Sequence, residues 1–337
     1  MIQQAIETLV SGGSLSTEEA ADAMNEIMGG DATPAQFGAF VTALRMKGET
    51  ADEIAGMARV MREKSLHVDI AGPVVDTCGT GGDGSGTFNI STAAGLVVAG
   101  AGVKVAKHGN RAMSGACGSA DVLETLGVKI NLSPEGVRRC LEDVGFGFMF
   151  AQVFHPSMRF AAAPRREIGI RTVFNILGPL TNPAGANSQL IGVASPDIGE
   201  MLASVLEMLG SAHALVVHGR DGLDEISLSE ATAVWELKDG TITSYSVTPE
   251  ELGFERALRS DLKISSPQEG AEMVRDVLLG AAGPTRNVVL VNAAGALVAA
   301  DRAKSIKDGV AIAADSIDSD AAIGKLEALI DLSQRLE

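Results

Sequence analysis

From the amino terminus to about residue 65, hydrophobic and polar positions repeat with the period of an α-helix. Phe37, Phe40, Val41 and Leu44 recur at the spacing i, i+3, i+4 and i+7, which places them on one face of a helix. Helix starts are marked by the capping-box pairs Ser16–Glu19 and Thr50–Glu53 and by the cap and proline Thr33–Pro34. Helices this short are stable only when their hydrophobic faces pack on a partner. The partner is either the rest of the chain or a second copy of it.

From Val74 onward, the pattern changes to short hydrophobic runs that alternate with helical stretches. Such runs between turn residues are typical of buried strands. They predict strands at residues 74–76, 103–106, 147–150, 190–193, 214–218 and 287–291, a hairpin of 233–237 with 241–246, and intervening helices such as 196–209 and 271–281. This alternation predicts an α/β fold, with a mostly parallel central sheet, flanking helices and one antiparallel hairpin.

A glycine-rich loop lies between the first predicted strand and a small apolar helix expected over residues 93–101. Its five glycines are Gly79, Gly81, Gly82, Gly84 and Gly86. Glycines let backbone N–H groups approach an anion closely, and the amino end of a helix favours negative charge. The polar side chains expected to cap the helix belong to Asn89, Ser91 and Thr92. The stretch therefore predicts a phosphate-binding βαβ unit.

The charge along this unit has the opposite sign to that of the chain. The net charge is −16, yet no Asp or Glu occurs from Gly84 to Ala120, where the basic side chains Lys104, Lys107 and Arg111 lie. We therefore expect an anion at this loop. The acidic chain as a whole lacks the basic surface that nucleic-acid binding needs, so no nucleic-acid partner is expected.

Three other interpretations of the loop fit less well. Residues 79–84 match the dinucleotide pattern G-x-G-x-x-G, but Lys104 and Lys107 lie where that motif has a ribose-binding acidic residue. A P-loop would have a lysine in place of Ser85. Glycines could also serve tight turns alone, although the helix and the basic residues that follow disfavour this alternative.

Longer motifs make the chain resemble the anthranilate phosphoribosyltransferase family. They are GTGGD at 79–83, FNIST at 88–92, KHGNR at 107–111, GSAD at 118–121, HPSM at 155–158, RTVFNILGPLTNPA at 171–184 and GLDEIS at 222–227. One departure is Ala116, where relatives often carry lysine. The resemblance implies a nucleoside phosphorylase/phosphoribosyltransferase-like fold. It consists of a helical domain, residues 1–70 completed by a segment within about 155–185, and an α/β domain over 71–337. It also implies a homodimer formed through the helical domain.

The reaction implied by the resemblance belongs to tryptophan biosynthesis. It transfers the phosphoribosyl group of phosphoribosyl diphosphate to the amine of anthranilate and releases diphosphate. The residues implied for phosphoribosyl diphosphate are Gly79, Gly82, Asp83, Thr87, Asn89, Ser91, Thr92, Lys107 and Ser119. Those implied for anthranilate are Gly79, His108, Asn110, His155 and Arg165, with the neighbouring Arg166 as the alternative to Arg165. Lys107 is expected to stabilise the leaving diphosphate, and no side chain is expected to act as a nucleophile.

Asp224 and Glu225 follow a predicted strand and a turn. Adjacent carboxylates repel each other unless a cation compensates them. Mg²⁺ binds to one or two carboxylates together with substrate phosphates, so the pair predicts a Mg²⁺ cofactor, whereas a solvated loop pair is the structural alternative. The resemblance favours the metal and implies Ser91 as a further ligand.

The cysteines and the lengths of the hydrophobic stretches indicate the cellular compartment. Cys78, Cys117 and Cys140 are odd in number and lack metal-ligand spacing, which indicates free thiols in a reducing compartment. No hydrophobic stretch is long enough to cross a membrane, and the first ten residues do not resemble a signal peptide, so a cytoplasmic protein without a membrane partner is expected. We interpret His67, His213 and His218 as structural residues.

Two other functions share this architecture. A pyrimidine nucleoside phosphorylase uses free phosphate and needs no pair of metal-binding carboxylates, so Asp224 and Glu225 disfavour it. A non-catalytic relative that binds nucleic acid would lose the anthranilate residues and gain basic surface. The chain keeps Asn110 and Arg165 and is strongly acidic, which disfavours this second alternative.

Overall fold

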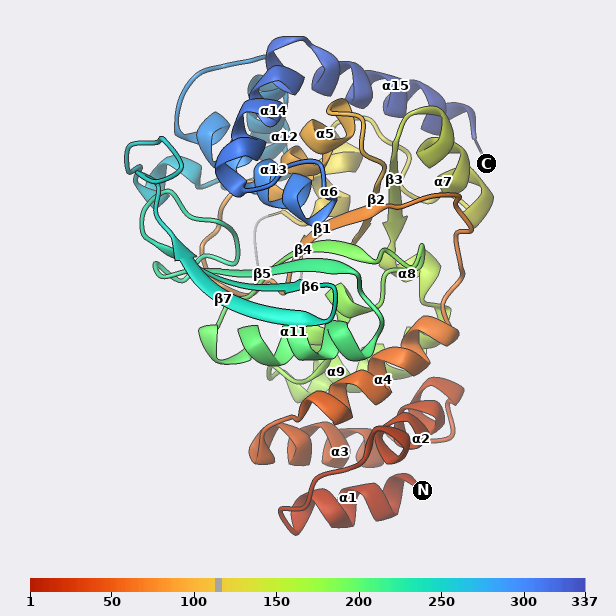
Figure 1. Ribbon diagram of the computed structural model, residues 1–337. Helices are drawn as coiled ribbons and strands as arrows, with labels where there is room; N and C mark the ends of the chain where they lie inside the picture. Colours follow the sequence, from red (N-terminus) through yellow and green to blue (C-terminus); the bar gives the residue numbers. More distant parts are fainter. Residues whose placement is uncertain (113–116, 337) are drawn as a thin grey trace.

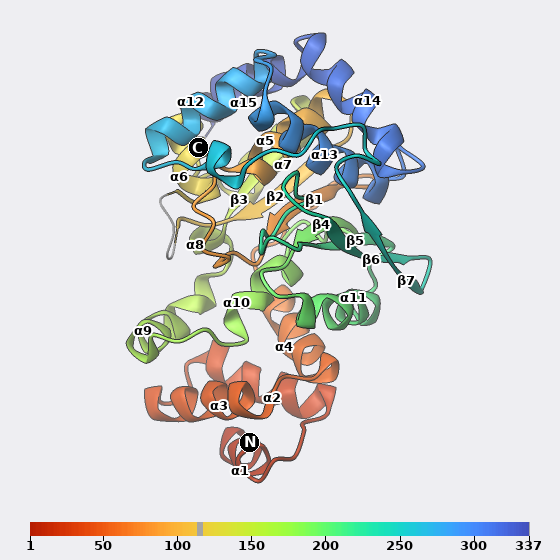
Figure 2. The same ribbon diagram turned by 90° about the vertical axis from the view of Figure 1, so that its left-hand side faces the viewer.

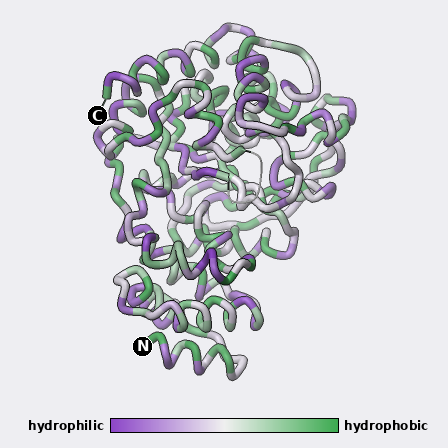
Figure 3. The backbone as a smooth tube through the Cα atoms, turned by 180° about the vertical axis from the view of Figure 1, so that it is seen from behind, coloured by the Kyte–Doolittle hydropathy of each residue, from purple (hydrophilic) through white to green (hydrophobic). Residues whose placement is uncertain are grey.

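The computed structural model describes residues 1–112 and 117–336. Four helices form the lower layer in Figure 1: α1 (Ile2–Val10), α2 (Thr17–Gly29), α3 (Pro34–Lys47) and α4 (Ala51–Glu63). Capping boxes at Ser16, Thr33 and Thr50 start the last three, because each side chain accepts a hydrogen bond from the backbone N–H three residues later. The predicted helix starts are therefore confirmed. Hydrophobic and hydrophilic segments alternate along these helices (Figure 3), as amphipathic packing requires.

A seven-stranded sheet forms the centre of the upper part. Its strands are β1 (Val75–Gly79), β2 (Val105–Gly109), β3 (Phe146–Phe150), β4 (Ser188–Gly192), β5 (His213–Gly219), β6 (Thr232–Lys238) and β7 (Thr241–Val247). The order across the sheet is β3-β2-β1-β4-β5-β6-β7. The first five strands pair in parallel, whereas β6 and β7 are antiparallel and form the predicted hairpin. The mostly parallel α/β fold is thus confirmed.

Helices cover both faces of this sheet. In Figure 1, α5 (Ile90–Gly100) and α13 (Pro284–Ala299) pack above it, and α11 (Gly199–Met208) packs below it. The remaining α-helices are α6 (Ser119–Thr125), α7 (Pro134–Asp143), α8 (Ala151–Phe154), α9 (Arg159–Ile168), α10 (Phe174–Leu177), α12 (Pro267–Leu278), α14 (Ile306–Asp318) and α15 (Ala321–Arg335). Short 3-10 turns occur at η1 (Pro156–Met158), η2 (Gly178–Leu180), η3 (Pro196–Ile198) and η4 (Arg259–Leu262).

The strand predicted at residues 287–291 is wrong, because these residues lie inside helix α13. Val288, Val289, Leu290 and Val291 are all buried. A helix that is buried on every side gives an uninterrupted hydrophobic run, so its pattern cannot be separated from that of a buried strand. The helix lies between the sheet and the neighbouring α14, which explains the uniform burial.

Part of the chain beyond residue 155 packs on the lower helices (Figure 2). The Phe174 ring lies 5.4 Å from the Phe37 ring, and Ala161 and Leu177 belong to the same hydrophobic core. Arg62 ties α4 to η2 and to the end of α11, because its guanidinium donates hydrogen bonds to the backbone oxygens of Leu180 and Leu209 at 2.7 and 3.2 Å. The lower helices therefore share one core with segments that come much later in the sequence.

Neither membrane crossing nor disulfide bonding is seen in the part of the chain that the structure describes. No helix there is both long enough and apolar enough to span a bilayer. Cys78, Cys117 and Cys140 are free thiols, as predicted.

Candidate functional site at the carboxyl edge of the sheet

Four parallel strands, β1, β2, β4 and β5, end at a glycine, and these glycines let loops approach the edge of the sheet. A Cβ atom at Gly79 or Gly192 would collide with Asp224, and one at Gly109 would collide with the Ser119 hydroxyl. Gly79 and Gly192 are also register partners across β1 and β4. From β1 the chain continues to β2 and β3 on one side, and from β4 it continues to β5 on the other side. Ligands of open α/β sheets bind where the strand order changes direction in this way.

The glycine-rich loop and the Asp224–Glu225 loop meet at this edge. The Gly81 N–H donates a hydrogen bond to Asp224 Oδ2 at 2.7 Å. The Asp224 N–H lies 3.5 Å from Asp83 Oδ2, a longer contact between the same two loops. Gly81 and Gly82 have positive φ angles of 65° and 74°, which glycine adopts without strain. Two segments far apart in the sequence thus form one acidic, glycine-lined surface.

The carboxylates at this surface are close together and poorly compensated. Burial raises the pKa of Asp224 to about 8, and the nearby charge of Asp83 adds to the effect. Burial and the charge of Asp224 hold the pKa of Glu225 well above its usual range. Such a cluster fits a site for a divalent cation, whose charge would relieve the repulsion. Among the described residues, no three His, Cys, Asp or Glu side chains are arranged to hold a metal alone, so a bound cation would also need oxygen ligands from a hydroxyl, a phosphate or water.

Lys107 brings a buried positive charge to the same edge. It lies on β2 with only 1% of its surface exposed, and its ammonium donates hydrogen bonds to the backbone oxygen of Thr77 and, at 3.2 Å, to Ser91 Oγ. Burial lowers the pKa of Lys107, whereas the negative charge of Asp76 raises it. Ser91 lies in the first turn of α5, so the ammonium and the amino end of this helix both favour an anion here.

Behind Lys107 lies a buried polar network that the sequence did not identify. Asp76 is fully buried on β1 and accepts hydrogen bonds from the His108 N–H at 3.3 Å and from Asn182 Nδ2 at 2.8 Å. Burial raises the pKa of Asp76 to about 6, and the positive charge of Lys107 opposes this rise. A charged residue inside a predicted buried strand was the available signal, because such a residue needs partners.

The expected capping role of Asn89 is wrong. Asn89 occupies the N-cap position of α5, but its side chain makes no capping hydrogen bond. Its Nδ2 instead donates to the backbone oxygen of Cys117 at 3.2 Å, which ties the start of α5 to the chain just before α6. Asn89 Oδ1 and Thr92 Oγ1 are buried without a hydrogen-bond partner in the described structure. Ser91 is not the N-cap either, since it lies inside the first turn of α5, and its hydroxyl accepts a hydrogen bond from Lys107.

The other residues predicted for the phosphate side lie around the same loop. Thr87 Oγ1 is 3.2 Å from Ser85 Oγ, and Ser119 is the first residue of α6, with its hydroxyl 3.4 Å from the Asn110 backbone oxygen. Asn110 itself is exposed directly after β2. Ala116, the predicted departure from the family pattern, lies outside the described residues.

His108 and His155 form a buried aromatic pair next to this edge. Their ring centroids are 4.9 Å apart, and the Nε2 atom of each ring lacks a partner among the described residues. His108 Nδ1 lies 3.2 Å from the Gly178 backbone oxygen. Burial lowers the pKa of His108 to about 3 and that of His155 to about 4. Both rings are therefore neutral at pH 7 and form an uncharged wall.

This pair predicts a loss of stability in acid. In the unfolded chain a histidine binds a proton near pH 6.5, but in the folded protein these two remain neutral. The contribution of these two histidines to stability is therefore present above pH 6.5, and each of them lowers the free energy of unfolding by about 2 kcal/mol between pH 6.5 and pH 5, opposite in sign to the buried carboxyls whose pKa is raised. Urea unfolding at several pH values measures this slope. His108→Asn should flatten it, whereas the same change at the exposed His67 should not. An unchanged slope in His108→Asn would contradict the prediction.

Arg165 and Arg166 lie near the end of α9 and differ in their surroundings. The Arg165 guanidinium is half-buried, 5.6 Å from the centre of the Phe174 ring, and burial lowers its pKa. No ion pair joins it to an acidic residue in the described chain. Arg166 is exposed. Of the two arginines, Arg165 is the one held against the interior.

Asn292 is a second residue that the sequence missed. It is fully buried on α13, its Oδ1 accepts from the Ile226 N–H at 2.8 Å, and its Nδ2 donates to the Ile226 backbone oxygen at 3.0 Å. Ile226 directly follows Glu225, so this amide anchors the loop that carries both carboxylates. The predicted strand at 287–291 ended just before Asn292, which concealed the role.

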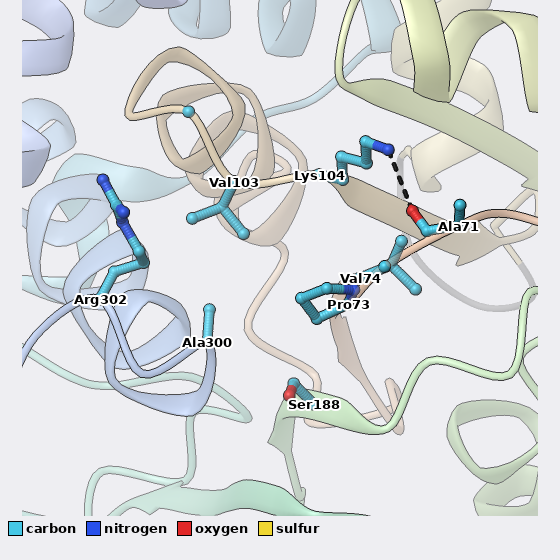
Figure 4. A pocket seen from close by; sticks show the side chains of 10 residues that line it. Ala71, Pro73, Val74, Val103, Lys104, Ser188, Ala300 and Arg302 are labelled. Carbon is cyan, nitrogen blue, oxygen red and sulfur yellow. Dashed lines mark hydrogen bonds between the residues drawn. The ribbon is translucent and has the colours of Figure 1, made fainter.

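A cavity of about 300 Å³ lies at the opposite, amino-terminal edge of the sheet (Figure 4). Its lining includes Pro73, Val74, Val103, Ser188 and Arg302. The nearby Lys104 side chain donates a hydrogen bond to the Ala71 backbone oxygen at 3.1 Å. None of these residues belongs to the candidate site: Lys104 comes just before β2, at the amino-terminal edge of the sheet, whereas Lys107 lies within β2 and its ammonium reaches the start of α5.

Two family models match the chain. The α/β domain of a glycosyl transferase family matches residues 71–323, and the helical bundle domain of a glycosyl transferase family matches residues 3–65. The first covers most of the chain and includes every strand of the sheet. The second covers α1 to α4.

Relatives found by sequence and relatives found by structure carry the same enzyme name. The anthranilate phosphoribosyltransferase of Dehalococcoides mccartyi is 56% identical over 100% of this chain and 99% of its own. That of Moorella thermoacetica is 55% identical over 98% of each chain. The crystal structure of the Thermus thermophilus enzyme superposes with a TM-score of 0.93 at 44% identity, covering 98% of this chain and 99% of that one. The Saccharomyces cerevisiae enzyme in complex with PRPP and Mg superposes with a TM-score of 0.92 at 30% identity, covering 99% and 98%.

Proposed function

The chain belongs to the anthranilate phosphoribosyltransferase family, and from this premise we propose how its residues divide the work of the reaction. The enzyme transfers the phosphoribosyl group of phosphoribosyl diphosphate to the amine of anthranilate and releases diphosphate, a step of tryptophan biosynthesis. The observation that supports the division best is the hydrogen bond from the Gly81 N–H to Asp224. It joins a loop suited to phosphate with a carboxylate suited to a cation.

The phosphoribosyl diphosphate side consists of the glycine-rich loop, the start of α5 and the start of α6. The proposed contacts are Gly79, Gly82, Asp83, Thr87, Asn89, Ser91, Thr92, Lys107 and Ser119. The unpartnered Asn89 Oδ1 and Thr92 Oγ1 support this assignment, because a buried polar atom without a partner is costly unless a ligand satisfies it. Lys107 stabilises the departing diphosphate through its positive charge.

Mg²⁺ belongs to this side of the site. Asp224, Glu225 and Ser91 are the proposed protein ligands, and the clustered carboxylates with raised pKa fit such an ion. When bound, the ion neutralises charge that develops on the leaving diphosphate. The yeast relative binds PRPP and Mg, which supports the binding of phosphoribosyl diphosphate together with Mg²⁺ here.

The anthranilate side lies toward α9 and the histidine pair. Arg165 is proposed to bind the carboxylate through its planar fork, with His108, His155, Asn110 and Gly79 around the ring. An aromatic amine is neutral at pH 7 and needs no strong base before it attacks. The protein therefore has to hold the amine in line with the anomeric carbon while positive charge stabilises the leaving group. The yeast relative forms a complex with 4-fluoroanthranilate, which supports an aromatic acid as the second substrate.

A fluorescence assay tests the activity directly. Anthranilate is fluorescent, and its signal should fall when phosphoribosyl diphosphate and Mg²⁺ are added to the enzyme. Omitting either one should stop the change. No fall in fluorescence, combined with release of a free base from a pyrimidine nucleoside and phosphate, would overturn the assignment in favour of a nucleoside phosphorylase.

Arg165→Ala should raise the Michaelis constant for anthranilate about ten- to hundredfold and leave that for phosphoribosyl diphosphate close to wild type. The reason is the loss of a charge-assisted hydrogen bond, worth about 1.5–3 kcal/mol. Steady-state kinetics with each substrate varied in turn measures both constants. Arg166→Ala is the matched control, since Arg166 is exposed one residue away. If Arg166→Ala carries the defect and Arg165→Ala is silent, the assignment is off by one residue.

We also propose that residues 1–70, with a segment within about 155–185, form a helical domain through which two copies associate. The exposed Val10 on α1, Met46 on α3 and Phe160 on α9 support an interface on this part of the chain. Sedimentation should then give a dimer at micromolar concentration, and a stable monomer would contradict it.

Three free thiols fit a cytoplasmic location, and the net charge of −16 gives no support to a nucleic-acid partner.

A further inference from the structure

Arg171 reaches from the connection between α9 and α10 to the glycine-rich loop. Its Nη2 donates a hydrogen bond to the Gly81 backbone oxygen at 3.0 Å. Gly81 is therefore held at both ends of its backbone, because its N–H donates to Asp224 and its oxygen accepts from Arg171. The carboxylate proposed for the cation and this guanidinium thus hold the same residue of the loop.

The guanidinium also lies directly against Gly82. A Cβ atom at Gly82 would collide with Nη1 of Arg171 and would lie 2.7 Å from its Cζ. Gly82 has a φ of 74°, a conformation that favours glycine, and a side chain there would also push the Arg171 guanidinium away from the loop. A cationic side chain therefore lies directly against the backbone of the glycine-rich loop.

The charge of Arg171 is not compensated within the described chain. No ion pair joins it to an acidic residue there, and the side chain is exposed. Arginine has five N–H donors, and to the residues that the structure describes Arg171 makes only the hydrogen bond to Gly81. The others are available for a ligand. Because the amino end of α5 and Lys107 also favour an anion at this loop, a further uncompensated cation points to a ligand with several negative charges.

We propose that Arg171 is a further binding residue for phosphoribosyl diphosphate, which holds the loop through Gly81 and contacts the diphosphate with its remaining N–H groups. This inference rests on the proposed function and adds a residue to it. Arg165 lies six residues earlier on the same segment. One segment would then carry a cation for each substrate, Arg165 for the aromatic acid and Arg171 for the diphosphate.

Three variants separate charge from hydrogen bonding. Arg171→Ala removes both, Arg171→Gln keeps a donor for Gly81 without the charge, and Arg171→Lys keeps the charge. The Michaelis constant for phosphoribosyl diphosphate should rise about ten- to hundredfold in Arg171→Ala and in Arg171→Gln, and Arg171→Lys should recover most of the loss. The Michaelis constant for anthranilate should change less than threefold. Calorimetric titration of phosphoribosyl diphosphate without anthranilate should show the same order of affinities.

Arg166→Ala serves as the control, because it removes an exposed arginine from the same segment without touching the loop. If Arg171→Ala matches Arg166→Ala in both constants and in titration, the inference is wrong while the proposed function stands. If Arg171→Gln binds like wild type, Arg171 only supports the loop and the direct contact is overturned. Wild-type protein that binds phosphoribosyl diphosphate but transfers nothing to anthranilate would instead refute the proposed function.

Discussion

Replacing Asp224 by Asn and Glu225 by Gln together should lower turnover about 10³-fold without lowering the unfolding temperature. Both side chains are proposed to hold Mg²⁺, and loss of the ion removes several kcal/mol of charge stabilisation from the transition state. The fold should survive, because burial and mutual repulsion already disfavour the charged carboxylates, as their raised pKa values indicate. Neutral amides of the same shape remove that repulsion.

Kinetics over a range of Mg²⁺ concentrations and thermal unfolding without Mg²⁺ test this double variant. Glu230→Gln is a suitable control, since Glu230 lies on the same loop region but pairs with Arg256 at the surface. Near-normal turnover of the folded double variant at limiting Mg²⁺ would refute the metal assignment. A large fall in the unfolding temperature would show that the two carboxylates support the fold instead.

Lys107→Met should lower kcat/KM for phosphoribosyl diphosphate by about 10²–10³-fold. The side chain is buried and its ammonium lies at the start of α5, where a fixed positive charge is proposed to act on the leaving diphosphate in a poorly solvated environment. Methionine keeps much of the volume and removes the charge. The Michaelis constant for anthranilate should change much less, because Arg165 and the histidine pair are the residues proposed to bind anthranilate.

Lys104→Met is the matched control for this variant. Lys104 lies on the same stretch of sequence but at the opposite edge of the sheet, where it binds the Ala71 backbone oxygen. The Lys104→Met variant should keep wild-type kinetics. If both lysine variants lose activity to the same extent, the effect comes from the sheet or the net charge, and the specific role of Lys107 is refuted.

Local patterns predicted most of the fold because they depend on neighbours in sequence. The capping boxes at Ser16 and Thr50 involve residues three apart, so they could be read directly and are confirmed. The hairpin of β6 and β7 also depends on its own short turn. The strand predicted at 287–291 failed because hydrophobic burial on all sides looks the same for a helix and a strand.

The composition of the site was harder to predict because its contacts join distant segments. Nothing local to Gly81 indicates that its N–H meets Asp224, or that its oxygen meets Arg171. The family resemblance supplied Asp224 and Lys107, but it did not supply Asp76 or Asn292, whose partners are visible only in three dimensions. The capping expectation for Asn89 failed for the same reason, since the competing Cys117 oxygen comes from a later segment.

The shared core of the lower helices affects how the chain can fold while it is being synthesised. Ribosomes synthesise α1 to α4 first, but their core also contains Ala161, Leu177, Leu202 and Val216. These partners have not been synthesised when the helices leave the ribosome. The same is true of Leu180 and Leu209, whose backbone oxygens accept the hydrogen bonds of Arg62. The nascent amino-terminal segment therefore carries an incomplete hydrophobic surface until roughly two thirds of the protein has been translated.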